Sequence, residues 1–270
     1  MDVQEKGKVF WHGPFYEGLQ LDLHQYRESL SYEKEHELSK EALIVDVMVV
    51  KKTKNVDIGK DIGRIFKDHN LIEFKSEQDS FSVRDYNKIL GYAQLYSSFE
   101  DVPLSDISVT ISLTMYPRAL ENYLKNVMHQ EIQDMSNGIY YIHGEKFPVQ
   151  ILENKKLSKS NLFLRNLRSN LTADDAAETA KAYAKLKDTE PKNAYFHGLV
   201  KANPKAFKEA MLMDAAAIDI VVEGLEEIGW LADRDLQKAR EIARGLKADN
   251  VPLHVIVKNT GLTLQEVEAL

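Results

Sequence analysis

Two short apolar segments carry charged residues at spacings that suit phosphodiester chemistry. Asp46 is the one carboxylate in ALIVDVMVV, and Glu73 and Lys75 lie two residues apart in LIEFK. Successive side chains of a strand point to opposite faces, so Glu73 and Lys75 are expected to share a face. If the two segments are neighbouring strands, two carboxylates and an ammonium group converge on one spot.

This group of residues predicts a site for a hard divalent cation. The carboxylates of Asp46 and Glu73 and the backbone carbonyl of Phe74 are oxygen ligands that suit Mg²⁺ or Mn²⁺. The ion would polarise a phosphoryl oxygen and lower the pKa of a water molecule, which Lys75 would orient. The same spacing also allows a structural interpretation, in which Asp46 and Lys75 form a buried ion pair and Glu73 is solvated at a strand end.

Strands and helices alternate around these residues in the first half of the chain. Apolar, β-branched runs predict strands, and apolar residues at helical spacing predict helices. The predicted strands cover residues 30–38 at a sheet edge, 42–50, 71–75, 107–116 and 138–144, and the predicted helices cover residues 14–26 and 82–97. Past Glu153 helical spacing prevails, so we divide the chain into an α/β core, residues 1–153, and a helical C-terminal region, residues 154–270.

The composition excludes several classes of site. The chain has no cysteine, which removes thiolate chemistry, disulfides and cysteine-based zinc sites. Its eight histidines lie singly and predict no histidine metal site. A net charge of −7 argues against tight, sequence-indifferent binding of nucleic acid, although basic residues within 51–67 and 155–168 could contact phosphates locally.

The chain shows no sign of a membrane or secretory segment. No apolar stretch approaches the roughly 18 residues that a membrane span needs. The first residues lack the basic and apolar regions of a signal peptide. We therefore expect a cytoplasmic protein with no membrane partner.

Four stretches of the chain together resemble a known family. They are IVDVMVVKK, GRIFKDHNLIEFKS, SVRDYNKILGYAQLYSS and MYPRALENYL. They resemble a PD-(D/E)xK nuclease-like family of Firmicutes, related to the recombination-promoting nucleases and a group of transposase-like proteins. The resemblance covers roughly residues 10 to 170. It implies a restriction-endonuclease-like core, in which helices flank a mixed central sheet, followed by a mainly helical C-terminal region.

The resemblance also implies roles for individual residues. Asp46 corresponds to the first metal carboxylate, Glu73 to the second, and Lys75 to the lysine of the motif. The proline that precedes the first aspartate in the family's motif is absent here. Asp57 and Asp61 are alternative upstream acids, but they lie in a polar segment with little strand character.

Three further residues are candidates for a supporting role. Glu17 could be the additional carboxylate that some relatives bring to the site, although a surface glutamate is the simpler interpretation. Lys88 and Tyr92 lie four residues apart on the helix after the Glu73 strand, where relatives place polar residues that support the site.

The last residues of the chain predict a helix, a turn and a helix. Gly261 suits the turn, and Thr263 with Glu266 forms a capping box that begins the second helix. Thr172 is expected to begin an earlier helix of the C-terminal region. The final helix presents acidic and amide side chains, which argues against base reading in the major groove and favours a docking element.

The function expected from the sequence is a Mg²⁺-dependent DNA endonuclease, associated with mobile elements. A phosphodiesterase that acts on RNA or on a substrate other than nucleic acid would use the same chemistry. Relatives often need two active sites to cut both strands, so a homodimer is expected. The alternative is a catalytically inactive protein of the same fold that serves as an interaction or regulatory module. The acidic composition favours that alternative. The presence of Asp46, Glu73 and Lys75 favours the enzyme, because a core without need of these charges could replace them with apolar residues at little cost.

Overall fold

The strands of the central sheet coincide with the most apolar, β-branched stretches of the chain, as expected for strands buried on one or both faces. The computed structural model describes residues 11–33, 48–53, 56–186, 192–211, 218–227, 229–249 and 251–270. In this part of the chain seven strands form one sheet, in the order β1-β2-β3-β4-β7-β6-β5. They are β1 (Leu30–Glu33), β2 (Met48–Lys52), β3 (His69–Lys75), β4 (Ile107–Leu113), β5 (Ile132–Asp134), β6 (Ile139–Ile142) and β7 (Val149–Glu153).

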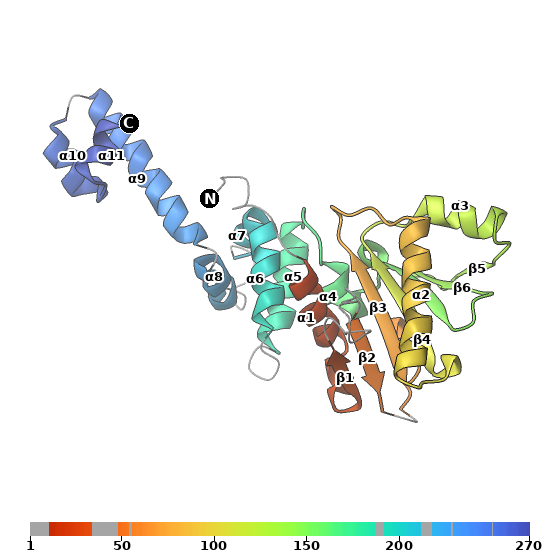
Figure 1. Ribbon diagram of the computed structural model, residues 1–270. Helices are drawn as coiled ribbons and strands as arrows, with labels where there is room; N and C mark the ends of the chain where they lie inside the picture. The colour runs from red at the N-terminus through yellow and green to blue at the C-terminus, as the bar shows by residue number, and fades with distance from the viewer. Residues whose placement is uncertain are drawn as a thin grey trace.

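The sheet is mixed, and its two central pairings are parallel. β4 pairs in parallel with both β3 and β7, whereas the outer pairs are antiparallel. Helices flank the sheet, and a helical region follows it along the chain (Figure 1). The predicted fold class, a mixed α/β core followed by a mainly helical region, is therefore confirmed.

Most of the predicted strands are present. The segments 71–75, 107–116 and 138–144 contain β3, β4 and β6, and β1 lies at the sheet edge as expected. Of the predicted strand 42–50, residues 48–50 belong to β2, and its earlier part, which includes Asp46, lies outside the described residues. β5 and β7 were not predicted.

The helices fall into two layers and an extension. They are α1 (His12–Asp22), α2 (Val83–Phe99), α3 (Arg118–Asn126), α4 (Leu162–Arg165), α5 (Ala173–Ala184), α6 (Asn193–Ala202), α7 (Pro204–Met211), α8 (Ile218–Glu227), α9 (Trp230–Ala248), α10 (Leu253–Thr260) and α11 (Leu264–Glu268). Short 3-10 helices occupy His24–Ser29, Asp61–Gly63, Leu104–Asp106, Asn154–Lys156 and Lys159–Asn161. None of the described helices is both long and apolar enough to cross a membrane.

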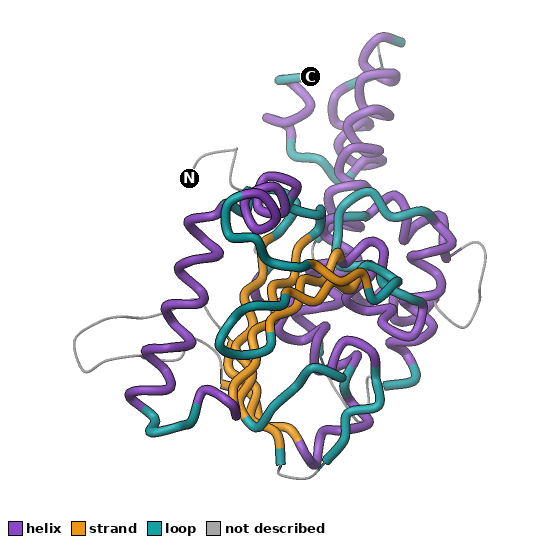
Figure 2. Tube along the Cα trace, turned by 90° about the vertical axis from the view of Figure 1, so that its right-hand side faces the viewer, coloured by secondary structure: helices purple, strands orange, loops and turns teal. Residues whose placement is uncertain are grey.

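The sheet separates two hydrophobic cores. On one face α1 and α4–α8 share a core with residues of β2 and β3, and on the other face α2 and α3 share a core with residues of β3 and β4. Figure 2 shows the strands between helices on both sides. Phe15 of α1 stacks on Phe74 of β3, with ring centroids 4.3 Å apart. The first core thus joins the sheet to helices on both sides of residue 153 in the sequence.

The last three helices form a small core of their own, drawn away from the sheet in Figure 1. Gly261 adopts the left-handed conformation (φ +70°) between α10 and α11, which a glycine tolerates without strain. The Thr263–Glu266 capping box and the Thr172 cap of α5 are both present. The predicted helix, turn and helix at the end of the chain are confirmed.

A buried carboxylate connects α1 to the helical region. Asp22 accepts hydrogen bonds from the backbone N–H groups of Phe163 (3.3 Å) and Leu164 (2.7 Å), in the first turn of α4. The Lys60 ammonium lies 3.5 Å from its carboxylate. Burial raises the pKa of Asp22 to about 6, against the lowering effect of Lys60 and the two amides.

We expect Phe15→Ala to destabilise the fold by about 3–5 kcal/mol, because it removes a buried ring from the contact between α1 and the sheet. Phe15 is 3% exposed. Phe99→Ala is the matched control, because Phe99 is 55% exposed at the end of α2 and its loss should cost less than about 1 kcal/mol. Urea unfolding of both variants measures the difference. Equal losses would contradict the packing described here.

Asp22 should make the free energy of unfolding fall as the pH rises from about 4 to about 6. Its folded pKa of about 6 lies above the ordinary value, so the native state holds this proton more tightly than the unfolded state in that window. At roughly 1.4 kcal/mol per pKa unit, the contribution lost is about 3 kcal/mol. Urea unfolding at several pH values should show a flatter profile for Asp22→Asn than for the wild type. Parallel profiles would contradict the assignment.

Candidate active site

Glu73 and Lys75 lie on the same face of β3, as the sequence predicts. β3 is an interior strand, paired with β2 on one side and β4 on the other. Phe74 packs in the core that contains α1, and Leu71 packs in the core that contains α2. Because side chains alternate along a strand, Glu73 and Lys75 face the α2 side.

The two side chains form a largely buried ion pair at the carboxyl end of the strand. Lys75 Nζ lies 3.0 Å from Glu73 Oε1, and the Glu73 side chain is 12% exposed. Burial alone would lower the pKa of Lys75, but the neighbouring carboxylates of Glu73, Asp85 and Asp79 outweigh it and raise this pKa above its ordinary value. Lys75 is therefore a fixed cation at neutral pH. The part of the structural interpretation that left Glu73 solvated is wrong.

Asp46 lies outside the described residues, but the strand that follows it is placed. β2 and β3 are antiparallel neighbours, as the predicted site required, with Met48 opposite Ile72 and Val49 opposite Leu71. Met48 and Ile72 belong to the α1 side of the sheet, the face opposite to Glu73. The described part of β2 thus contributes Met48 and Val50 to the face opposite to Glu73, and Val49 to the same face as Glu73.

The described part of the predicted ligand set consists of hard oxygen donors. It comprises the Glu73 carboxylate and the backbone carbonyl of Phe74, which suit Mg²⁺ or Mn²⁺ in charge and donor type. Within the described residues no three His, Asp or Glu side chains gather in a way that could hold a metal ion. A complete site therefore depends on Asp46.

Glu17 of α1 forms a hydrogen bond to α6. Its Oε2 accepts a hydrogen bond from the backbone N–H of Tyr195 (2.7 Å), in the first turn of that helix. Burial raises the pKa of Glu17, although the Tyr195 and Ala194 amides and Lys192 oppose this shift. α1 packs on the face of the sheet opposite to Glu73, so the contact at α6 supports a structural role.

Lys88 and Tyr92 share a face of α2, as predicted. Lys88 Nζ lies 5.3 Å from the centroid of the Tyr92 ring. Asp85 lies one turn earlier, where hydrogen bonds from Ser82 lower its pKa, and Lys75 and Lys88 lower it further. The negative charge of Asp85 thus acts on Lys75 as well as on Lys88. The sequence gives no sign of this interaction, because Asp85 also fits the third position of the capping box that begins α2.

Asp61, the alternative upstream acid, makes hydrogen bonds that stabilise the fold. Its carboxylate accepts hydrogen bonds from Asn161 Nδ2 (2.7 Å) and Ser158 Oγ (3.2 Å), which hold the segment before α4. Asp57 is exposed.

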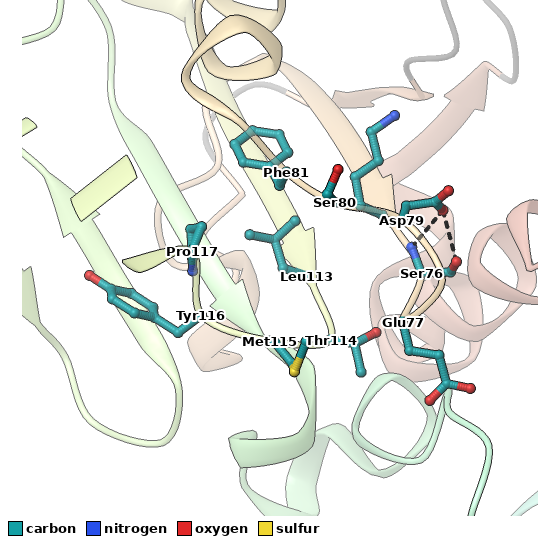
Figure 3. A pocket seen from close by; sticks show the side chains of 11 residues that line it. Ser76, Glu77, Asp79, Ser80, Phe81, Leu113, Thr114, Met115, Tyr116 and Pro117 are labelled. Atoms are coloured by element: carbon teal, nitrogen blue, oxygen red, sulfur yellow. Dashed lines mark hydrogen bonds between the residues drawn. The ribbon is translucent and has the colours of Figure 1, made fainter. Parts of the chain in front are cut away.

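A cavity of about 140 Å³ lies beside Lys75, between the turn after β3 and the turn after β4 (Figure 3). Its lining comes from residues 75–77, 79–81 and 113–117. The sequence interpretation missed it. The available signal was that parallel strands bring their carboxyl ends to one edge of a sheet, where ligands commonly bind.

Comparison of the chain with protein-family models, with curated proteins and with solved structures finds no match.

We expect Glu73→Gln to lower the pKa of Lys75, because the substitution removes the negative charge that opposes the effect of burial. Asp85→Asn should lower it less, because Glu73 acts both through its charge and through a hydrogen bond to Lys75. An NMR titration of the lysine side chains measures both shifts. A Lys75 pKa that is unchanged in Glu73→Gln would show that the ion pair does not exist in solution.

Proposed function

We propose that this chain is a Mg²⁺- or Mn²⁺-dependent nuclease that hydrolyses phosphodiester bonds. The observation that carries the proposal is the largely buried Glu73–Lys75 pair, held 3.0 Å apart at the carboxyl end of an interior strand and beside a cavity. A buried ion pair contributes little to stability, because desolvation offsets the attraction between the charges. Its presence on this strand is therefore better explained by chemistry than by folding.

The residues divide into ligands and a fixed cation. Glu73, the Phe74 carbonyl and Asp46 would hold the metal ion, which when bound polarises a phosphoryl oxygen and activates water. Lys75 holds its proton, because the surrounding carboxylates raise its pKa. It would act by orienting the attacking water and by offsetting the charge that develops on the phosphate.

DNA is the proposed substrate, and an association with mobile elements is part of the same proposal. Both follow from the resemblance of the chain to the PD-(D/E)xK family. Cutting both strands of a duplex would require two sites, which makes a homodimer the proposed assembly. With a net charge of −7, contacts to phosphates must come from local cations such as Lys75 and Lys88.

A second candidate function is an interaction or regulatory module without turnover. The observation in its favour is that Glu73 and Lys75 already satisfy one another in the described structure. In that case the pair would be a structural charge cluster, and the protein would have no metal affinity at Glu73.

Calorimetric titration of Mg²⁺ and Mn²⁺, with plasmid nicking followed in the same samples, should separate the two functions. We expect Asp46→Asn and Glu73→Gln to abolish metal binding and nicking, because each removes a carboxylate ligand. Lys75→Met should keep metal binding but reduce nicking by about 100-fold or more, because it removes a charge used in the transition state.

Glu121→Gln and Lys125→Met provide the matched control. They break another Glu–Lys pair, with an Nζ–Oε1 distance of 2.6 Å on the surface of α3, and should change neither metal binding nor nicking. The nuclease proposal would be contradicted if the wild type binds no metal and the Asp46 and Glu73 variants only lose stability. That result would support the interaction module.

A further inference from the structure

The cavity at the carboxyl ends of β3 and β4 has one apolar side and one polar side. Figure 3 shows two groups of side chains, with Tyr116, Pro117 and Leu113 to the left and Ser76, Asp79 and Glu77 to the right. At about 140 Å³ it is smaller than the roughly 300–1,000 Å³ of pockets that enclose whole drug-sized ligands. A single flat ring is the kind of group that it could take.

The apolar side is suited to the faces of such a ring. Phe81 contributes aromatic surface from the segment that precedes α2, and Leu113 is buried at the end of β4. The Tyr116 ring borders this side and packs on Tyr140, with ring centroids 4.4 Å apart. Met115 is 63% exposed, so its thioether is available to a ligand that enters the cavity. Aromatic and thioether groups favour contact with flat, polarisable rings.

The polar side offers acceptors that are held in place. Asp79 Oδ2 accepts hydrogen bonds from the backbone N–H (3.2 Å) and the hydroxyl (2.8 Å) of Ser76, and Glu77 Oε1 accepts one from the backbone N–H of Ser169 (3.1 Å). These bonds occupy one oxygen of each carboxylate and fix the turn after β3. Asp79 is exposed, so its other oxygen can accept an N–H group from the edge of a ligand, whereas the Glu77 carboxylate extends toward Ser169.

Thr114 carries an unsatisfied hydroxyl at the same cavity. The residue is 8% exposed, and its Oγ1 has no hydrogen-bond partner among the described residues. Buried hydroxyl groups are normally bonded, because an unmade hydrogen bond destabilises the fold. A ligand that bonds to Thr114 would remove that cost.

The charge of the lining selects among ligands. Asp79 and Glu77 would repel a phosphate from the cavity, which leaves Lys75 to serve the phosphodiester beside Glu73. A neutral ring with N–H donors on its edge matches the acceptors of the polar side and the surfaces of the apolar side. Nucleobases have these properties, and in a duplex the donors are already used in base pairs.

We propose that this cavity binds an unpaired nucleobase of the substrate, adjacent to the phosphodiester at Glu73 and Lys75. The inference rests on the proposed nuclease function and refines it, because it makes a single strand or a flipped-out base the preferred substrate. Thr114 and the free oxygen of Asp79 recognise the edge of the base, and Phe81 and Met115 contact its faces.

Fluorescence anisotropy with the full chain tests this inference, in EDTA to prevent cleavage. The probes are a labelled single-stranded oligodeoxyadenylate and an abasic phosphodiester of equal length. We expect the wild type to bind the oligodeoxyadenylate about 10-fold more tightly than the abasic strand. Thr114→Val should reduce that preference about threefold or more, while the melting temperature stays the same or rises, because the substitution removes an unsatisfied hydroxyl without changing the side-chain shape.

The outcomes separate this inference from the proposed function. Equal affinity of the wild type for the two probes overturns the nucleobase site and leaves the nuclease proposal intact. Full base preference in Thr114→Val, with Phe99→Ala as an exposed control on α2, overturns the role of Thr114. No binding of either probe, without metal or with Ca²⁺ added, overturns the inference together with the nuclease proposal on which it rests.

Discussion

The charge of Glu73, buried on an interior strand, is the constraint on which the site depends. A carboxylate in this position must be compensated, and Lys75 compensates it from two residues along the same strand, at 3.0 Å. The period of two then requires that Ile72 and Phe74 face the other way, where Phe15 stacks on Phe74. One face of β3 thus carries Glu73 and Lys75, and the other face packs in the core that contains α1. A site placed on a strand held in this way keeps its geometry better than one placed on a loop.

The parallel pairing of β3 with β4 explains where the cavity lies. Lys75 is in register with Leu113, so both strands end at the same edge of the sheet. The chain leaves that edge through two different turns, one polar and fixed by Ser76 and Asp79, the other leading through Tyr116 into α3. The space between the turns is the cavity of Figure 3. The charged pair and the cavity are therefore two consequences of one pairing.

The features that the sequence predicts correctly are those that depend on residues close together in the chain. The alternation of LIEFK predicts the shared face of Glu73 and Lys75, and the apolar run of β4 and the capping box of α11 are equally local. Apart from the short strands β5 and β7, the missed features depend on residues far apart in the chain. Nothing near Glu17 signals that it bonds to Tyr195, and nothing near Asp22 signals that it bonds to Leu164. The cavity was missed for the same reason, because its lining comes from two segments that only the β3–β4 pairing brings together.

The central claim, that Glu73 and the Phe74 carbonyl are metal ligands, is tested most directly by X-ray diffraction from crystals grown with Mn²⁺. An anomalous difference map should show a peak within coordination distance of a Glu73 carboxylate oxygen and the Phe74 carbonyl oxygen, with Asp46 as a further ligand. A map without a peak there, from crystals in which Lys75 and Glu73 remain paired at high Mn²⁺ concentration, would show that the pair is structural and would contradict the claim.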